Sequence, residues 1–309
     1  MGTAVFTHPA SRGHLTPAGH PERVARIEAV EAALDAQAGL DRQSAPLAAR
    51  AEVERCHPAS HVDRIAAAIP AQGVQALDAD TWVSPGSLTA ALHAVGGICA
   101  AVDAVLADKA ANAFVACRPP GHHAERETPM GFCLFGTAAI GAMRALDHHG
   151  LARVAVLDFD VHHGNGTQDL LWQEGRAFFA SSHQMPLYPG TGSPDETGAH
   201  GQILNVPLAP GSGGAAMRRA WGGQILPAAQ AFAPDLIIVS AGFDAHAADP
   251  LAGLMWDEED FRWLTAAICD LADATCGGRV VSTLEGGYDL TALAASVAAH
   301  VDVLKERGG

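Results

Sequence analysis

Features that would place a chain in a specialised class are scarce in this sequence. Its 309 residues include six cysteines, none in a C-x-x-C pair. This thin spacing disfavours a disulfide framework or a structural zinc knuckle, so we interpret the cysteines as reduced thiols. No uncharged apolar run reaches about 18 residues, and residues 1–9 lack the basic and apolar parts of a signal peptide. We therefore expect a cytoplasmic protein that does not insert into a membrane.

Basic residues are also few, with 19 Lys and Arg against 34 Asp and Glu, which gives a formal net charge of −15. This charge opposes both the phosphate backbone of nucleic acids and the surface of anionic lipids. We expect no direct nucleic-acid or membrane partner, and a cationic substrate is easier to accommodate. The composition does not indicate an oligomeric state.

No repeat with a period of 20 to 50 residues and no Ser/Gly-rich linker divides the chain. We therefore expect one domain over residues 1–309, although the length alone would also permit two smaller ones. Apolar, β-branched runs predict buried strands at residues 113–117, 154–160, 177–181, 236–240 and 280–284. Three- and four-residue apolar spacing predicts helices at residues 23–37, 87–107, 137–148, 215–232, 258–274 and 291–305. This alternation predicts an α/β fold with a mostly parallel sheet and helices on both faces.

The Gly- and Pro-rich segments follow the predicted strands, at residues 118–121, 164–166, 189–192 and 286–288. In an open α/β sheet, the loops at the carboxyl ends of the strands form the usual active site. The polar residues that could act in catalysis or bind a metal lie in these same loops.

Acidic and imidazole side chains end two of the predicted strands. Asp158, Asp160 and His162 are two residues apart and therefore face one side of an extended backbone. The strand at 236–240 runs into Asp244. Asp160, His162 and Asp244 around one ion would leave a position for water, as in a catalytic zinc site. The alternative is that these residues cap helices or form structural ion pairs, but converging buried acids without a cation would be costly.

Two adjacent imidazoles, His122 and His123, follow a loop that Pro and Gly make rigid. A neutral imidazole can take a proton from water and pass it to a leaving amine, and Asp158 could orient one of the two rings. Tyr288 follows two glycines and could donate to an oxyanion, although it could also be a turn aromatic. Residues 131–133 and Tyr188 could line an apolar channel, or simply belong to the core.

Taken together, several motifs resemble the histone deacetylase family, within the wider arginase/deacetylase superfamily. The resemblance spans nearly the whole chain and rests on Arg118 to His123, Gly131-Phe132-Cys133, Asp158 to Gly166, Gly242 to His246 and Glu285 to Tyr288. The amino-terminal segment is similar too, with His14 before Gly19-His20-Pro21-Glu22-Arg23, and with Asp80 before Ser84-Pro85-Gly86.

The resemblance implies one zinc ion on Asp160, His162 and Asp244, with His122 and His123 as tandem histidines and Tyr288 as the electrophilic phenol. It also implies that Asp158 orients His122, that Phe132 lines the acyl-lysine tunnel, and that Asp80 grips the substrate. We expect Gly131 and Tyr188 to contact substrate beside Phe132. A structural potassium ion would lie near Asp158, Asp160, His162 and Ser181, and Arg23 would line an internal exit channel.

Asn165 departs from the family members that carry Asp there. It would give His123 a neutral partner and make this ring less basic. Gly164 and His246 occupy positions where the arginases carry further manganese ligands, which disfavours a dinuclear ureohydrolase.

We therefore predict a zinc-dependent hydrolase of N-acyl amines. Acetyl-lysine in proteins or peptides is the first substrate class, and an N-acetylpolyamine or another small amide is the alternative. A non-catalytic metal-binding interaction module would be expected to have lost a ligand or the tyrosine, and neither loss is seen.

Overall fold

The computed structural model describes residues 1–308, and its centre is an eight-stranded sheet in the order β2-β1-β5-β10-β9-β6-β7-β8. All pairings within this sheet are parallel. The strands are β1 (Thr3–Thr7), β2 (Asp41–Ser44), β5 (Asn112–Ala116), β6 (Val154–Asp158), β7 (Ala177–Gln184), β8 (Ile203–Leu208), β9 (Leu236–Ala241) and β10 (Val280–Leu284). The predicted α/β fold with a mostly parallel sheet is confirmed.

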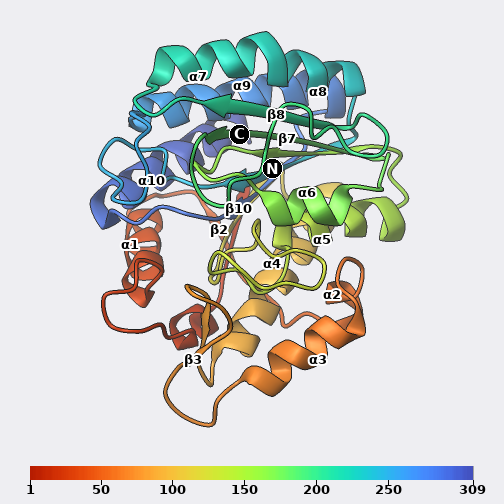
Figure 1. Ribbon diagram of the computed structural model, residues 1–309. Coiled ribbons are helices and arrows are strands. Elements are labelled where there is room, and N and C mark those ends of the chain that lie inside the picture. The colour runs from red at the N-terminus through yellow and green to blue at the C-terminus, as the bar shows by residue number, and fades with distance from the viewer. Residues whose placement is uncertain (309) are drawn as a thin grey trace.

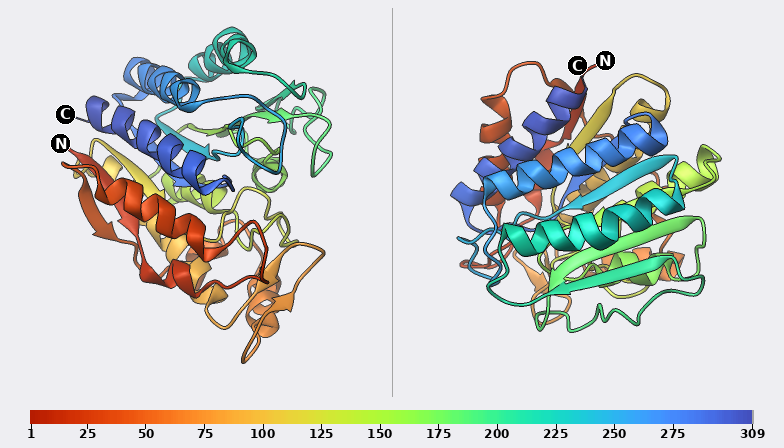
Figure 2. Two further views of the ribbon diagram at one scale, coloured as in Figure 1. Left: turned by 90° about the vertical axis from the view of Figure 1, so that its left-hand side faces the viewer. Right: turned by 90° about the horizontal axis from the view of Figure 1, so that it is seen from above.

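Helices cover both faces of the sheet (Figure 1). One layer holds α1 (Val24–Asp35), α7 (Gly214–Ala220), α8 (Leu226–Phe232), α9 (Glu258–Cys276) and α10 (Leu290–Arg307). The other holds α4 (Ser87–Leu106), α5 (Thr137–Met143) and α6 (Asn165–Leu171). Figure 2 shows α1 beside α10 and the two termini close together.

Each central strand contributes side chains to two separate cores, because successive side chains of a strand point to opposite faces. In β6, Ala155 and Leu157 belong to the core that includes residues of α9 and α10, whereas Val154 and Val156 belong to the core that includes residues of α4 and α5. All five residues of β6 are buried. Burial on both faces explains why the central strands are continuous apolar runs instead of alternating patterns.

The elements without such runs were not predicted. Strand β2 is exposed at all four positions and lies at the sheet edge, so it carries no hydrophobic signal. The prediction also omitted β1, β8, α2 (Arg50–Val53), α3 (Ala59–Ala68) and the small antiparallel pair β3 (Gln75–Ala76) and β4 (Trp82–Val83). The helix predicted at 215–232 is α7 and α8 joined by a π turn over Trp221–Ile225. A second π turn, Arg144–His148, extends α5.

Helix α4 is long and apolar enough to cross a membrane by length and composition alone, but 67% of its most hydrophobic window is buried inside the protein. It packs on β5 and β10 through residues such as Val95, Ile98 and Val102. Its hydrophobicity is therefore accounted for by its place in the core.

Candidate functional site

Asp160, His162 and Asp244 are buried and place one potential ligand atom each within 4.8 Å of the others. His162 Nδ1 lies 3.1 Å from Asp160 Oδ1 and 3.2 Å from Asp244 Oδ2. The hydrogen bond of His162 Nδ1 goes to Asp160 Oδ1, so within residues 1–308 the buried Asp244 Oδ2 has no hydrogen-bond partner of its own. An unpartnered carboxylate oxygen beside a second carboxylate and an imidazole is a donor set that fits a divalent cation such as zinc.

Backbone amides hold these carboxylates in place. Asp160 Oδ2 accepts a hydrogen bond from Gly286 N at 2.9 Å, and Asp244 Oδ1 accepts one from Val161 N at 2.9 Å. The amide approach depends on glycine, because a Cβ at Gly286 would lie 2.0 Å from Asp244 Oδ2. Strand β6 ends at Asp158, so Asp160, which the predicted strand included, lies with His162 on the loop beyond it.

Electrostatics at the site also favour a cation. Burial alone would lower the pKa of His162, but the carboxylates of Asp160 and Asp244 raise it to about 10. Burial raises the pKa of the neighbouring Asp158 to about 6. Several buried carboxylates therefore share one region, and positive charge is needed to balance them.

The tandem histidines lie next to this cluster and have different partners. His122 Nδ1 lies 3.0 Å from Asp158 Oδ2, and His123 Nδ1 lies 2.7 Å from Asn165 Oδ1. Burial would lower the pKa of His122, but the charges of Asp160 and Asp158 raise it well above its ordinary value. Burial, together with the charge of His122, holds the pKa of His123 well below its ordinary value. His122 is therefore the more readily protonated of the two rings.

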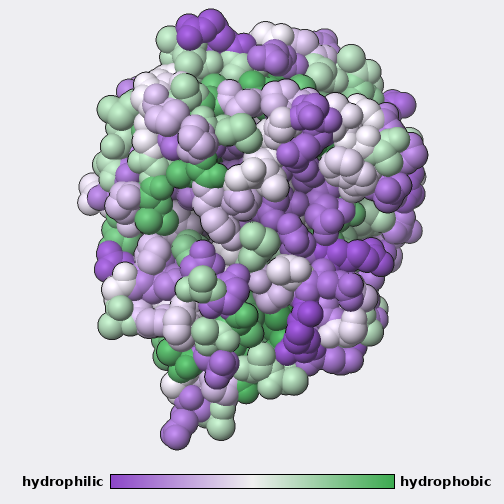
Figure 3. Space-filling model, viewed as in Figure 1, coloured by the Kyte–Doolittle hydropathy of each residue, from purple (hydrophilic) through white to green (hydrophobic). Residues whose placement is uncertain are grey.

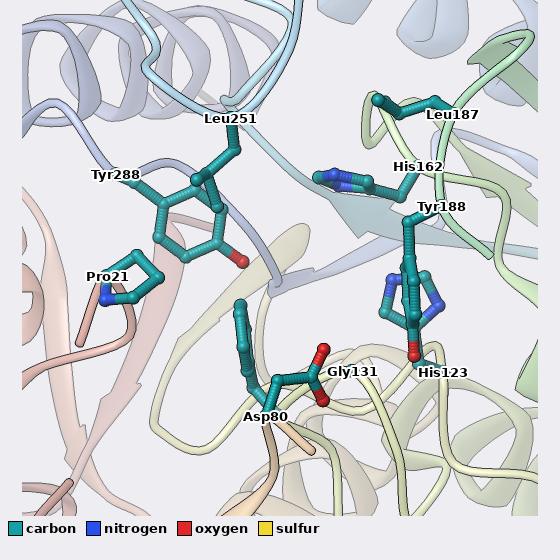
Figure 4. A pocket seen from close by; sticks show the side chains of 10 residues that line it. Pro21, Asp80, His123, Gly131, His162, Leu187, Tyr188, Leu251 and Tyr288 are labelled. Atoms are coloured by element: carbon teal, nitrogen blue, oxygen red, sulfur yellow. The ribbon is translucent and has the colours of Figure 1, made fainter. Parts of the chain in front are cut away.

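A pocket of about 250 Å³ opens over this cluster. It is lined by Pro21, Asp80, His123, Gly131, Phe132, His162, Leu187, Tyr188, Leu251 and Tyr288. Figure 4 shows the hydroxyl of Tyr288 pointing into the pocket, with His162 and Tyr188 on the opposite side and Asp80 between them. All four residues expected to contact substrate, Asp80, Gly131, Phe132 and Tyr188, thus lie around one cavity.

The walls of the pocket depend on an unusual backbone beside His123. Gly131 has a φ of +55°, and a Cβ there would lie 2.4 Å from the His123 ring. Phe132 follows with a φ of +70°. This turn brings the Phe132 ring to 5.8 Å from that of Tyr288, measured between ring centroids. The turn is strained for Phe132, and its position at the pocket is consistent with a functional constraint.

The expectation for Arg23 is wrong. Its side chain is exposed at the start of α1, and Arg26, one turn later, is fully buried. Arg26 donates hydrogen bonds to the carbonyl oxygens of Gly287 and Glu285, both at 2.6 Å, and its guanidinium lies 4.8 Å from the centroid of the Tyr288 ring. It shares Glu22 with Arg118, which is also fully buried.

The hydrogen bonds of three further carboxylates were not foreseen. The Glu285 carboxylate accepts hydrogen bonds from the amides of Gly121 and His122, at 2.7 and 3.1 Å, and one from Ser240 Oγ at 3.1 Å. Asp249 Oδ2 accepts one from Tyr288 N at 2.7 Å. Glu125 Oε1 accepts one from Asn165 Nδ2 at 2.8 Å. Glu285 begins a motif that the sequence analysis recognised, but nothing in the local pattern indicates its partners.

Ser181 is buried on β7 opposite Asp158 of β6, and its Oγ lies 2.9 Å from His183 Nδ1. His246 lies away from the ligand cluster, with its Nε2 3.6 Å from a carboxylate oxygen of Glu258. A Cβ on Gly164 would lie 2.2 Å from Asp158 Oδ2, so this position has no room for a ligand side chain.

Comparisons with known proteins agree with this geometry. The model of the histone deacetylase domain matches residues 20–304. The chain is 41% identical to histone deacetylase 10, chloroplastic, of Oryza sativa subsp. japonica, over 94% of this chain and 70% of that protein. It is 42% identical to the histone deacetylase-like amidohydrolase of Pseudomonas aeruginosa, over 91% and 74%.

A solved structure of the HDA15 HD domain superposes with a TM-score of 0.93 at 33% identity, covering 99% of this chain and 89% of that one. The arginase/deacetylase fold implied by the sequence motifs is therefore confirmed. The matched region includes every strand-end loop that forms the pocket. On these grounds the chain belongs to the histone deacetylase family, whose members are deacetylases and related amidohydrolases.

Proposed function

We propose that the protein is a zinc-dependent deacylase of N-acyl amines, with acetyl-lysine in proteins or peptides as its first substrate class. The observation that carries this proposal is that His123, His162 and the Tyr288 hydroxyl face one pocket of about 250 Å³. A proton acceptor, a potential metal ligand and a hydrogen-bond donor around one cavity are the groups that amide hydrolysis requires.

Asp160, His162 and Asp244 would hold the zinc ion. Two carboxylates and one imidazole with an open position suit a catalytic site, and the unpartnered Asp244 Oδ2 supports the assignment. When bound, zinc supplies a Lewis acid that polarises the acyl carbonyl and lowers the pKa of a water molecule.

The residues of the chain then divide the proton transfers between them. His123 accepts the proton of the attacking water through Nε2, because its Nδ1 is bonded to Asn165. It later passes the proton to the leaving amine. The Tyr288 hydroxyl donates a hydrogen bond to the oxyanion that develops from the acyl carbonyl. His122, paired with Asp158, carries positive charge among the buried carboxylates.

The pocket lining favours acetyl-lysine over a polyamine. Asp80 is the one carboxylate among the ten lining residues, and the remaining walls include Pro21, Leu187 and Leu251. An apolar channel suits the methylene chain of lysine, and Asp80 could accept a hydrogen bond from a substrate backbone amide. A polyamine carries further ammonium groups that would need more anionic partners.

An N-acetylpolyamine is the second candidate, because the net charge of −15 would attract a polycation. We also propose a structural potassium ion near Asp158, Asp160, His162 and Ser181. Asp158 and Ser181 are register partners on adjacent strands, so their backbone groups lie side by side. The cytoplasmic location stays a prediction.

The substrate class is tested with the zinc-loaded protein on matched acetyl-lysine peptides, longer acyl-lysine peptides and acetylated polyamines. We expect the highest kcat/KM on an acetyl-lysine peptide. Preference for acetylated polyamines would select the second candidate. Hydrolysis of none of these acyl amines by protein with full zinc content would contradict the proposed function.

A further inference from the structure

The proposed proton acceptor, His123, is the inner member of a row of three polar side chains. His123 Nδ1 lies 2.7 Å from Asn165 Oδ1, and Asn165 Nδ2 donates to Glu125 Oε1 at 2.8 Å. Asn165 Nδ2 also lies 3.3 Å from the thioether sulfur of Met130, which is a weak acceptor. His123 and Asn165 are buried, whereas Glu125 is half-buried at the outer end of the row.

The chemistry of these groups allows one arrangement of hydrogens. An ionised carboxylate only accepts hydrogen bonds, so Asn165 must turn its NH₂ group toward Glu125. Its carbonyl oxygen then faces His123 and can only accept. The Nδ1 atom of a neutral His123 must therefore carry the hydrogen, which leaves the lone pair on Nε2. We propose that Glu125 is a positioning residue that fixes the Asn165 amide and, through it, the catalytically competent tautomer of His123.

The backbone around Glu125 makes this arrangement rigid. Glu125 and Thr128 exchange backbone hydrogen bonds at 3.0 and 3.4 Å, and Arg126 N donates to Asp169 Oδ2 on α6 at 2.8 Å. At the start of α6, a Cβ on Gly166 would lie 2.4 Å from Ala124 O. The turn that carries Glu125 is therefore packed directly against the helix that carries Asn165.

The same geometry explains why an amide suits position 165. An Asp there would put a second carboxylate about where Asn165 Nδ2 now lies, 2.8 Å from Glu125 Oε1. Two carboxylates in contact repel each other unless one takes a proton. Asn165 and Glu125 thus form a matched pair, and Asn165→Asp should be harmful alone but tolerated together with Glu125→Gln, whose amide can donate to the new carboxylate.

This role of Glu125 rests on the proposed function, because it assumes that His123 Nε2 accepts a proton during turnover. Two separate measurements distinguish a failure of this role from a failure of the proposed function. The hydrogen position on His123 is read by two-bond ¹⁵N–¹H NMR correlation in the zinc-loaded protein labelled at histidine, with the signal assigned by its loss in His123→Gln. Turnover is read on an acetyl-lysine peptide in the same preparations.

In the wild type we expect hydrogen on Nδ1 of His123 and none on Nε2. In Glu125→Ala, we expect the Nδ1–H form to lose population and kcat to fall at least about tenfold with little change in KM, because removing a supporting partner disturbs the reacting group and not the pocket. Asn165→Asp should lose about as much, and Asn165→Asp/Glu125→Gln should return to within about threefold of the wild type. Glu127→Ala, an exposed carboxylate in the same turn, is the matched control and should change neither readout.

Hydrogen on Nε2 in the wild type would overturn the assignment, as would a Glu125→Ala protein with unchanged kcat and unchanged tautomer. Equal losses in Asn165→Asp and in the double variant would also overturn it. If the zinc-loaded wild type hydrolyses no acyl amine, the proposed function fails, while the NMR measurement still decides the tautomer.

Discussion

At the scale of single residues, the hydroxyl of Tyr288 can be removed without breaking the contacts that hold the rest of the residue in place. Its hydroxyl points into the pocket (Figure 4), while its backbone amide is fixed by Asp249 and its ring contacts Phe132 and the Arg26 guanidinium. Tyr288→Phe should keep the zinc content and the melting temperature of the wild type. We expect kcat to fall by about 100-fold or more, the usual loss for one oxyanion donor. An unchanged kcat on an acetyl-lysine peptide would assign Tyr288 a structural role.

The hydrogen bonds of Glu285, more than its charge, should stabilise the fold. Burial raises its pKa to about 7, although the neighbouring His122 charge lowers it. The amides of Gly121 and His122 both donate to it. Glu285→Ala would leave these buried donors unpaired, so we expect a loss of about 3 kcal/mol in the free energy of unfolding.

Glu285→Gln retains an acceptor oxygen for both amides and a donor for the Ser240 hydroxyl. Urea unfolding should place the free energy of unfolding of this variant within about 1 kcal/mol of the wild type. We also expect kcat to be highest in the wild type, lower in Glu285→Gln and lowest in Glu285→Ala. Ser240→Ala, which removes only the contact at Glu285 Oε1, is the milder control. Equal destabilisation by Ala and Gln would show that the negative charge, and not hydrogen bonding, is what the fold requires.

At the scale of elements, the sequence predicts the strands that are buried on both faces and misses the exposed edge strand. The strands β5, β6, β9 and β10 are continuous apolar runs, and the loops after them carry the ligand cluster, the tandem histidines and Tyr288. The edge strand β2 consists of Asp41–Ser44, all exposed, and its pairing with β1 cannot be read from these residues. Its conformation depends on the neighbouring strand and not on its own pattern.

The candidate site could be predicted where its residues follow an apolar strand in a recognisable motif, as in the segment from Asp158 to Asn165 and at Asp244 and Tyr288. Glu285 contacts Gly121 across 164 positions, and no local pattern reports such a contact. Arg23 was expected at an internal channel only from the resemblance of its motif, and no local pattern separates it from Arg26 three residues later. The helix begins at Val24, so Arg23 is its exposed cap and Arg26 points inward.

Three elements meet around His300, which gives a test of the fold away from the pocket. Its imidazole on α10 lies 2.7 Å from Thr265 Oγ1 of α9 and 2.8 Å from Ser282 Oγ of β10. Burial lowers its pKa to about 3. In the unfolded chain its pKa is about 6.5, so between these values the unfolded state binds more protons and stability falls as the pH falls.

From pH 7.5 to 5.5, His300 should therefore cost the protein about 1.4 kcal/mol of unfolding free energy. His300→Gln should lose this part of the pH dependence, although it is less stable at both values. His148→Gln, at an exposed position, should keep the wild-type dependence. Urea unfolding at the two pH values measures the difference, and parallel behaviour of wild type and His300→Gln would contradict the buried neutral state.

At the scale of the whole molecule, the net charge of −15 is the property most relevant to substrate encounter. Figure 3 shows hydrophilic residues over much of one face, interrupted by small hydrophobic groups. A negative field should gather basic peptides, and salt screens it beyond about 10 Å at 0.1 M. Raising the ionic strength should lower kcat/KM for a basic acetyl-lysine peptide and hardly affect a neutral one.

Substitution of Asp80 distinguishes a direct contact with the substrate from attraction by the net charge of the protein. If its carboxylate accepts a hydrogen bond from a substrate backbone amide, Asp80→Asn should lower kcat/KM for basic and neutral peptides alike. If it acts by charge, only kcat/KM for the basic peptide should fall. Equal salt dependence of both peptides, with a silent Asp80→Asn, would leave the acidic surface without a role in substrate binding.

The central claim is that Asp160, His162 and Asp244 hold one metal ion on which deacylation depends. It is tested most directly by adding zinc to metal-free wild type and Asp244→Ala, while bound zinc and hydrolysis of an acetyl-lysine peptide are measured together. In the wild type, activity should rise with bound zinc and saturate at one ion per chain, and Asp244→Ala should show neither tight zinc binding nor turnover. Full activity in metal-free protein, or an Asp244→Ala variant with one zinc and near-normal kcat, would contradict the account.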